Sequence, residues 1–277
     1  MCSLKLPFMK TLNILVVLGS ALVCAHSLLG AVEVPAGVEN SSYDRLLKKY
    51  VNGQGLVAYG RWKESAEDMK ALNDYVAQFN KKGSPATGNE RYATLINAYN
   101  SLVLQWILQN YPTESIWMLK DSFKAKRHKV GGEIVALEDI ENSALRPEFG
   151  YRTHAVLVCA ARSCPPLQES AYSASQLDEQ AGHAYRNWLG RADLNEFFVQ
   201  KNEAAVSSIF KWFKGDFDKA GGPKAVIAKY APSSARAMLE KPDCKLSYKN
   251  YNWGLNDQGS HGRNYSKTNL ILDNLFK

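Results

Sequence analysis

The stretch that decides the fold is ERYATLINAYNSLVLQWILQNYP, residues 90–112. Its apolar residues cover nearly the whole circumference of a helix, which predicts a helix buried on all sides rather than one on the surface. Asn110 and Pro112 mark its end, because both residue types favour helix termination. A helix of this kind needs packing partners on every face, and the rest of the chain has to supply them.

Four further stretches have helical periodicity. Residues 65–81 begin with Ser65 as an N-cap and Asp68 three residues later, and apolar side chains then recur at helical spacing. The other stretches are residues 42–51, 173–190 and 222–239. Helices are therefore predicted on both sides of residues 90–112 along the chain.

Short strands are predicted between these helices. Residues 128–146 predict a hairpin that turns at Gly131-Gly132 and leads into a short helix. The run RTHAVLVC, residues 152–159, is apolar and β-branched, which predicts a buried strand. Residues 195–217 predict a strand followed by a helix, and residues 244–257 predict a final strand. Helices packed on a small, mostly antiparallel sheet make an α+β class.

Length and composition restrict the function classes. The chain has 277 residues, of which 45% are hydrophobic, so it can build a hydrophobic core. Its formal net charge of +7 is spread thinly, and the densest basic cluster is FKAKRHK, residues 123–129. A thinly spread positive charge does not favour a nucleic-acid partner.

The N-terminus is typical of a secretory signal peptide. Lys5 and Lys10 precede a long apolar run that ends in small residues near Ala31. We therefore expect residues 1–31 to be removed and the protein to be exported, to the periplasm or outside the cell. A retained membrane anchor is the alternative, and a lipid-modified Cys24 is a weaker one. No later segment is apolar enough to cross a membrane, so no stable span is expected once the signal is removed.

The sequence also predicts how the rest of the chain is divided into segments. Residues 32–42 are expected to be a linker, residues 43–257 the folded domain and residues 258–277 a C-terminal tail. The mature chain would keep Cys159, Cys164 and Cys244. An odd number of cysteines leaves at least one thiol unpaired within the chain.

The two neighbouring cysteines occur in HAVLVCAARSCPPL, residues 154–167. Their spacing and the lack of a second matching pair do not favour zinc, and no cofactor is expected. On a regular strand Cys159 would lie ~16 Å from His154 and face the other side. Cys164 lies beyond the strand, and its loop spans at most ~17 Å, so Cys164 could return to His154. Arg162 would lower the pKa of a nearby thiol. A disulfide from Cys159 to Cys164 or to Cys244 stays open.

Other residues are candidates for supporting roles. Asn97 and Asn100 lie in the central helix and could bridge backbone groups or orient a histidine. Glu138 and Glu141 lie three apart on one helical face, where they could orient His154 or pair with Arg146. Most tryptophans are expected in the core, and an aromatic floor for a sugar or a peptide is the alternative; the residues concerned are Trp106, Trp117, Trp188, Trp212 and Trp253.

Five blocks in order resemble one known family. They are LINAYNSLVLQWILQNYP, VGGEIVALEDIENSALRP, THAVLVCAARSCPPLQESAYSASQLDEQ, VSSIFKWFKGDF and YNWGLND. Together they resemble the domain of unknown function 547 family over roughly residues 43–257. The resemblance implies a papain-like fold, in which a central buried helix packs on an antiparallel sheet. It implies no reaction, because fold does not determine function.

Carried over from that family, several positions become site candidates. Asn252 and Trp253 of YNWGLN are similar to the asparagine–tryptophan stretch that orients the histidine in papain-like proteases, although here the two residues are adjacent. The other positions that match the family pattern are Asn97, Tyr99, Asn100, Glu138, Glu141, Arg146, His154, Cys159, Cys164, Pro165, Pro166 and Asn256.

These observations support two hypotheses, and a third class, thiol redox exchange, would require a disulfide of Cys159 and Cys164 that is readily reduced. In the first, the protein is a thiol-dependent hydrolase or acyl-transfer enzyme that acts on a peptide or a small amide-containing substrate. Cys164 attacks, His154 takes its proton, and Glu141, Asn97 or Asn252 fixes the imidazole. In the second, the protein is a non-catalytic periplasmic binding or scaffolding module, with a structural disulfide in the loop of residues 159–164.

Overall fold

The structure is a computed structural model that describes residues 32–263 and residue 265. The described residues belong to one compact unit, and residues 1–31, 264 and 266–277 lie outside the description. The expected signal peptide and most of the expected tail therefore lie outside the description. No helix in the described part of the chain is long and apolar enough to span a bilayer.

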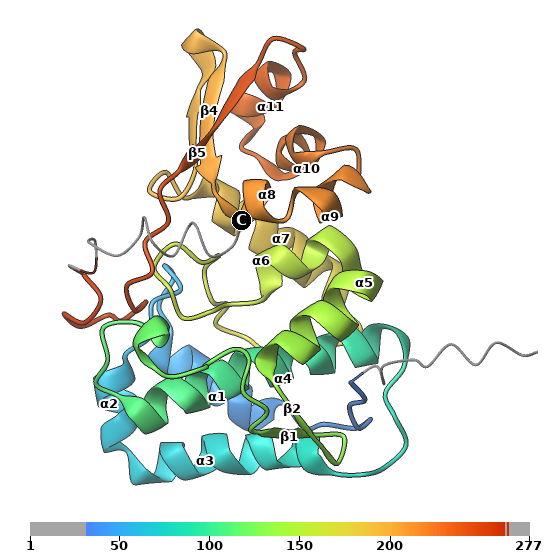
Figure 1. Cartoon of the computed structure of the whole chain (residues 1–277), viewed down its shortest axis with the longest axis vertical. Helices are drawn as coiled ribbons and strands as arrows, with labels where there is room; N and C mark the ends of the chain where they lie inside the picture. The colour runs from blue at the N-terminus through green and yellow to red at the C-terminus, as the bar shows by residue number, and fades with distance from the viewer. Residues whose placement is uncertain (1–31, 264, 266–277) are drawn as a thin grey trace, which may run out of the picture. The chain divides into compact units, whose positions relative to one another are not determined.

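The central helix is α4, Gly88–Asn110, as the sequence predicts. Every residue from Ala93 to Leu104 is buried, because the helix has neighbours on all sides. Its main packing partners are α3, Ala66–Ala77, the π-helical segment η3, Asp139–Leu145, and α2, Tyr59–Glu64. In Figure 1, α3 and α4 lie side by side in the lower half of the molecule.

The first part of the unit is helical. α1, Ser41–Tyr50, packs on α3, whose N-cap Ser65 accepts a hydrogen bond from the Asp68 N–H. This confirms the predicted cap. Val32 and Val34 are buried in the core, and α1 begins inside the segment that was expected to be a linker. Residues 32–42 are therefore part of the folded unit.

The strands form two small sheets among the described residues. β1, His128–Val130, and β2, Glu133–Val135, form the predicted antiparallel hairpin. The other sheet has the order β3-β4-β5, with β3, Glu196–Phe198, antiparallel to β4, Glu203–Ser207. β5, Lys245–Lys249, pairs in parallel with β4. The α+β class is confirmed, but the three-stranded sheet is mixed and the main partners of α4 are helices.

The predicted strand over residues 152–159 is wrong. A nearly continuous helical run passes from η3 through α5, Arg146–Phe149, and η4, Gly150–Arg152, to α6, Thr153–Val156. Residues 157–159 are then irregular. Asn100 supplies the hydrogen bonds that a neighbouring strand would have supplied, so the β-branched residues are buried without a sheet. The expectation that a regular strand would turn Cys159 away from His154, and leave only Cys164 able to return to it, therefore does not apply.

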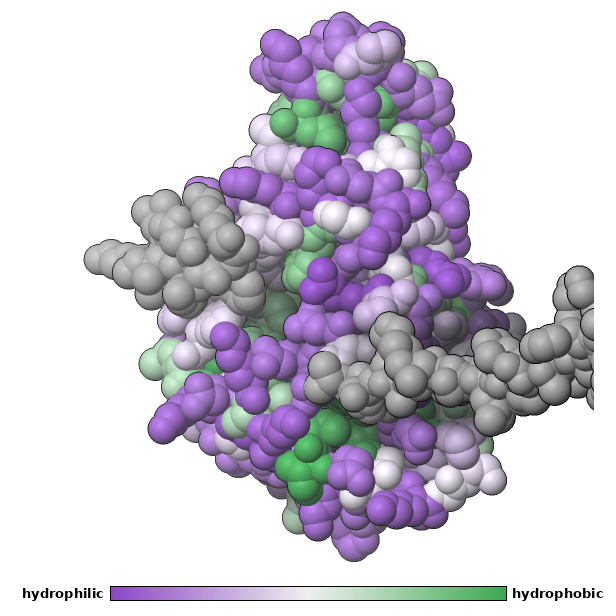
Figure 2. All heavy atoms as spheres, turned by 45° about the vertical axis from the view of Figure 1, so that its right-hand side comes forward, coloured by the Kyte–Doolittle hydropathy of each residue, from purple (hydrophilic) through white to green (hydrophobic). Residues whose placement is uncertain are grey.

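Short helices complete the unit. α7, Leu177–Gly190, packs on α6 and on α10, Pro223–Tyr230, while α8, Ile209–Trp212, follows directly after β4. The remaining two α-helices of the described residues are α9, Lys214–Asp218, and α11, Ser233–Leu239. The face drawn in Figure 2 is mainly hydrophilic, and its apolar side chains form small separate patches.

Candidate functional site

The predicted histidine and cysteines border one cavity of about 670 Å³, here called the disulfide cavity. It lies where α4, η3, α5, α6 and α8 meet the segments around residues 117–124, 159–165 and 251–253. Its apolar and aromatic wall consists of Tyr99, Trp117, Met118, Leu119, Phe123, Leu157, Pro165, Ile209, Trp212, Phe213, Tyr251 and Trp253. Its polar lining consists of Lys120, Asp121, Ser122, Lys124, Glu138, Glu141, Asn142, Arg146, Thr153 and His154, and Cys159 and Cys164 complete it.

Three tryptophans build one side of the cavity. The Trp212 ring stacks on the Trp253 ring with their centroids 5.8 Å apart, and Trp117 meets Trp253 edge to face at 5.2 Å. Trp188 instead is fully buried in the core against Phe210. The expected core role is therefore confirmed for Trp188, whereas Trp117, Trp212 and Trp253 line the cavity.

His154 is held at the cavity by a carboxylate that sequence reasoning missed. Its Nε2 lies 2.9 Å from Asp216 Oδ2, and the same oxygen accepts a hydrogen bond of 2.7 Å from Arg146 Nε. The imidazole stacks on Phe213 at 4.3 Å. Asp216 and Phe213 both lie at the α8–α9 corner, so that corner fixes both the position and the orientation of the histidine.

The charges around His154 determine which of its ring nitrogens carries the proton. The hydrogen bond from His154 and the hydrogen bond and charge of Arg146 hold the pKa of Asp216 well below its usual range. Burial lowers the pKa of His154, although Asp216 opposes that effect. A neutral imidazole beside an ionised carboxylate must place its proton on Nε2. Nδ1 is then an acceptor, and it has no hydrogen-bond partner within residues 32–263.

Glu141 faces the same cavity from η3. Its Oε2 accepts a hydrogen bond of 3.3 Å from the hydroxyl of Tyr99. Burial raises the pKa of Glu141, and Arg146 partly offsets this. The cavity therefore presents a proton acceptor at His154 and a carboxyl group that holds its proton more strongly than usual at Glu141.

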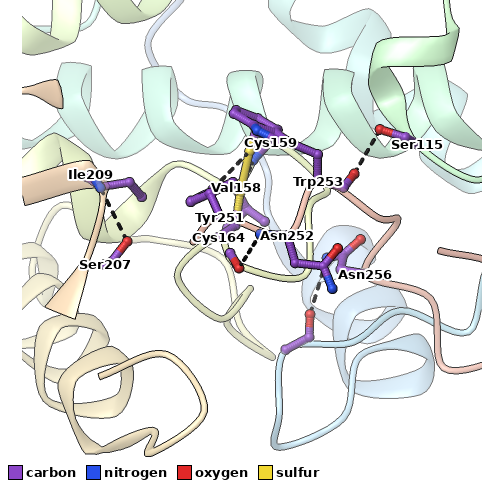
Figure 3. The surroundings of a disulfide bond; sticks show 12 residues. Ser115, Val158, Cys159, Cys164, Ser207, Ile209, Tyr251, Asn252, Trp253 and Asn256 are labelled. Carbon is purple, nitrogen blue, oxygen red and sulfur yellow. Dashed lines mark hydrogen bonds between the residues drawn. A yellow bond between two sulfur atoms is a disulfide. The ribbon is translucent and has the colours of Figure 1, made fainter. Parts of the chain in front are cut away.

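Cys159 and Cys164 form a disulfide, and Figure 3 shows it beside Tyr251 and Trp253. Cys164 is buried, whereas Cys159 is partly exposed. Cys164 Sγ accepts hydrogen bonds from the backbone N–H of Cys159 at 3.1 Å and from the Tyr251 hydroxyl at 3.2 Å. Cys244 is a buried free thiol, so of the two pairings left open the structure contains Cys159–Cys164. In this oxidised state Cys164 carries no free thiol.

The two asparagines of α4 bind backbone groups instead of the histidine. Asn97 Nδ2 donates to the Tyr172 carbonyl at 2.8 Å and Asn97 Oδ1 accepts from the Tyr172 N–H at 2.9 Å. Asn100 makes the same double contact with Val156 O and Val158 N, both at 2.9 Å. His154 is instead oriented by Asp216, so in this structure both asparagines hold the chain around the site.

Two more predicted residues, Arg162 in the loop and Asn252 beside it, do not line the cavity. Arg162 Nη2 donates to the Asp257 carbonyl at 2.8 Å, so its charge is directed toward the C-terminal segment. Asn252 accepts a hydrogen bond from the Gly254 N–H, and its own N–H donates to Ser163 Oγ at 2.8 Å. Of Asn252 and Trp253, only Trp253 lines the cavity.

Asp216 and Tyr251 are the residues that sequence reasoning missed. Both lie in stretches that carry the family resemblance, KWFKGDF and YNWGLND. Asp216 is 62 positions from its partner His154, and no local spacing rule connects them. Within the described ranges, no group of three His, Cys, Asp or Glu side chains is placed to hold a metal ion.

Residues 84–189 match the family model described as Protein of unknown function, DUF547. The resemblance expected from the sequence is thereby confirmed over this segment, which includes α4, His154, Glu141 and both bonded cysteines. Asp216, Tyr251 and Trp253 lie outside the matched range. Comparison with curated proteins and with solved structures found no match.

Proposed function

Given a chain whose residues 84–189 match the DUF547 family, we propose that the disulfide cavity binds a small amphipathic molecule or a peptide side chain that carries an amide group. One observation carries this proposal: an aromatic wall and a few convergent polar groups enclose about 670 Å³. Ligand sites in proteins typically measure ~300–1,000 Å³ and combine an apolar lining with a small number of placed polar groups.

The polar end suggests the amide. Neutral His154 offers an acceptor at Nδ1, and the Glu141 carboxyl, whose pKa burial raises, offers a donor in its protonated form. An amide has one N–H to donate and one carbonyl to accept, so it complements both groups. The aromatic rings opposite would cover an apolar or aromatic body.

Two matched tryptophan variants test the proposal. Trp212 and Trp106 are both partly buried, but only Trp212 lines the cavity. N-acetyl amides of aromatic amino acids are titrated while intrinsic fluorescence is recorded. Trp212→Ala should weaken binding about tenfold or more, and Trp106→Ala, which removes a ring outside the cavity lining, should weaken it much less. Equal losses in both variants, or no binding to the native protein, would contradict the proposal.

A second candidate function is thiol-dependent hydrolysis or acyl transfer by the reduced protein. It is favoured by the two donors at Cys164 Sγ, which would stabilise a thiolate, and by His154 on the same cavity. The Cys164 sulfur would attack the amide carbon to form a thioester, and His154 would pass a proton to the leaving amine. Water would then release the acyl group.

Reduction of the disulfide provides the experiment for this candidate. Amide cleavage should appear only after reduction and should be abolished in Cys164→Ser, and peptide mapping of the reduced native protein should place the label of a thiol-reactive probe on Cys164. Cys244→Ser, which removes the other thiol of the described chain, is the matched control and should retain both signals. Labelling that persists only at Cys159 or Cys244 would reject Cys164 as the nucleophile.

We also propose that the protein is exported. A disulfide supports an oxidising compartment, because such bonds rarely persist in the cytosol. The mature protein isolated from fractionated cells should begin after residue 31 and appear in the exported fraction. An N-terminus that still includes the apolar segment, in membranes, would instead indicate the anchored alternative.

A further inference from the structure

We infer that the disulfide cavity supports thiol–disulfide exchange, in which an aromatic or apolar thiol attacks Cys159 and Cys164 leaves. This inference rests on the proposed function in one respect, namely that a ligand can enter the cavity. It adds an activity to the site and names the substrate class, a thiol whose body fits the aromatic wall.

The exposures of the two cysteine residues predict which sulfur is attacked. Both cysteines line the cavity, but Cys159 is partly exposed whereas Cys164 is only 4% exposed. An incoming thiolate can therefore reach Cys159 more readily. His154, which also lines the cavity, can take the proton of the entering thiol at Nδ1.

The hydrogen bonds at Cys164 predict which sulfur leaves. The Cys159 N–H and the Tyr251 hydroxyl both donate to Cys164 Sγ, and the Tyr251 oxygen lies farther from Cys159 Sγ, at 3.6 Å. Donors stabilise a developing negative charge on the sulfur that they contact. A sulfur that leaves as a stabilised thiolate leaves faster, so exposure and hydrogen bonding favour the same direction.

The exchange balances with two equivalents of thiol. The first thiolate forms a bond to Cys159 Sγ, the Cys159–Cys164 bond breaks, and Cys164 holds the electron pair as a thiolate. A second thiolate attacks the external sulfur of the mixed disulfide and releases Cys159, which takes up a proton. Two external thiols are oxidised to one disulfide, and the protein disulfide is reduced.

The loop between the cysteines is fastened independently of the disulfide. Arg162 N–H donates to the Gly254 carbonyl at 2.8 Å, and Ser163 N–H donates to the Asn252 carbonyl at 3.1 Å. The Asn256 N–H donates to the Ala160 carbonyl at 3.0 Å. These bonds would keep the two sulfurs close after reduction, which makes the exchange reversible.

The first experiment maps the site of attack. Oxidised protein is mixed with 4-mercaptophenylacetate, free thiols are blocked with N-ethylmaleimide at early times, and peptides are analysed by mass spectrometry. The thiol adduct should be on Cys159 and the maleimide on Cys164. The rate should exceed that of a disulfide-closed peptide of residues 154–167 by about tenfold. An adduct on Cys164, or a rate equal to that of the peptide, would overturn the inference.

The second experiment removes one donor. Tyr251→Phe keeps the ring and should slow the exchange about threefold, because a Cys164 thiol that has lost one donor is less acidic and leaves more slowly. In the reduced protein, the pH at which iodoacetamide alkylation of Cys164 is half-maximal should rise. Tyr248→Phe is the control at an exposed tyrosine of β5. Equal rates and equal pH profiles for the native protein and Tyr251→Phe would remove the basis for Cys164 as the leaving group.

A compound without a thiol separates this inference from the proposed binding function. N-acetyltyrosinamide, an amide of the kind used in the binding experiment, should bind and slow the exchange competitively. If it binds but no adduct forms on Cys159 with the thiol, the exchange is rejected and the binding function stands. If the adduct forms at the expected rate and the compound neither binds nor competes, the exchange stands and the binding function is rejected.

Discussion

Asn97 and Asn100 on α4 differ from His154 and Glu141 at the disulfide cavity, although all four are polar side chains placed in or beside the core. Each asparagine uses its oxygen and its nitrogen on one backbone segment, Tyr172 for Asn97 and residues 156–158 for Asn100. His154 and Glu141 each have one hydrogen-bonded contact, to Asp216 and to Tyr99, and both face an enclosed space.

The difference separates two uses of a buried polar group. A group whose hydrogen bonds are all made within the protein stabilises the structure and has little left to offer a ligand. A group that keeps an open acceptor or an unusual proton affinity in a cavity can act on whatever enters. By this criterion the helix asparagines are structural and the histidine and the glutamate belong to the site.

The strongest test of this comparison is Asn100→Ala. The change leaves the Val156 carbonyl and the Val158 N–H buried without their partners, at ~1–3 kcal/mol each. We expect the free energy of unfolding in denaturant to fall by about 3 kcal/mol. Asn187→Ala, at a half-buried residue of α7, is the control and should change the free energy of unfolding little. If both variants lost the same small amount, Asn100 would not hold the segment before Cys159.

Asp216→Asn tests the other half of the comparison and should have a smaller effect. The variant loses charge-assisted hydrogen bonds with His154 and Arg146, so we expect the protein to be destabilised by about 2 kcal/mol near pH 7. The pKa of Asp216 is depressed in the folded state, so its contribution is present above the unfolded pKa of about 4 and is lost as the pH falls below it.

Urea unfolding at pH 7 and at pH 3 measures this difference. The gap between native protein and Asp216→Asn should be smaller at pH 3, because the unfolded carboxyl has taken up its proton there. Asp218→Asn, which changes an exposed carboxylate paired with Lys214 on the same helix, is the control and should show little effect. A gap that is independent of pH would mean that the Asp216 charge does not stabilise this corner.

Much of the fold could be predicted from patterns that are local in the sequence. The buried helix, the Ser65 cap and the hairpin at Gly131-Gly132 each depend on residues within a few positions of one another. The run at residues 152–159 could not be assigned in this way. Its β-branched residues favour a strand, but the contact with Asn100, more than fifty positions away, satisfies its backbone without one.

The sequence predicted several residues that line the cavity, but not the residues that form hydrogen bonds with them. His154, Glu141, Cys159, Cys164 and Trp253 were all singled out, and all line the disulfide cavity. Their pairing was not predictable, because it depends on how distant helices pack: Asp216 comes from α9, Tyr99 from α4 and Tyr251 from the segment after β5. A polar residue type is visible in a sequence, whereas the number of its hydrogen bonds is a property of the fold.

Glu141→Gln should have the smallest effect on stability, and it should stabilise the protein rather than destabilise it. Burial raises the pKa of Glu141 in the folded state, so the native protein loses stability as the pH rises from the unfolded pKa of about 4 through the folded value. Glutamine keeps the shape and the acceptor for the Tyr99 hydroxyl but cannot ionise. The variant should match the native protein at pH 4 and be more stable by about 0.5 kcal/mol at pH 8, measured by thermal or urea unfolding. Glu148→Gln, at an exposed carboxylate paired with Arg91, should gain nothing with rising pH. If Glu141→Gln instead lost stability at pH 8, the carboxylate would be stabilised inside the cavity, and Glu141 would resemble the fully paired asparagines rather than His154.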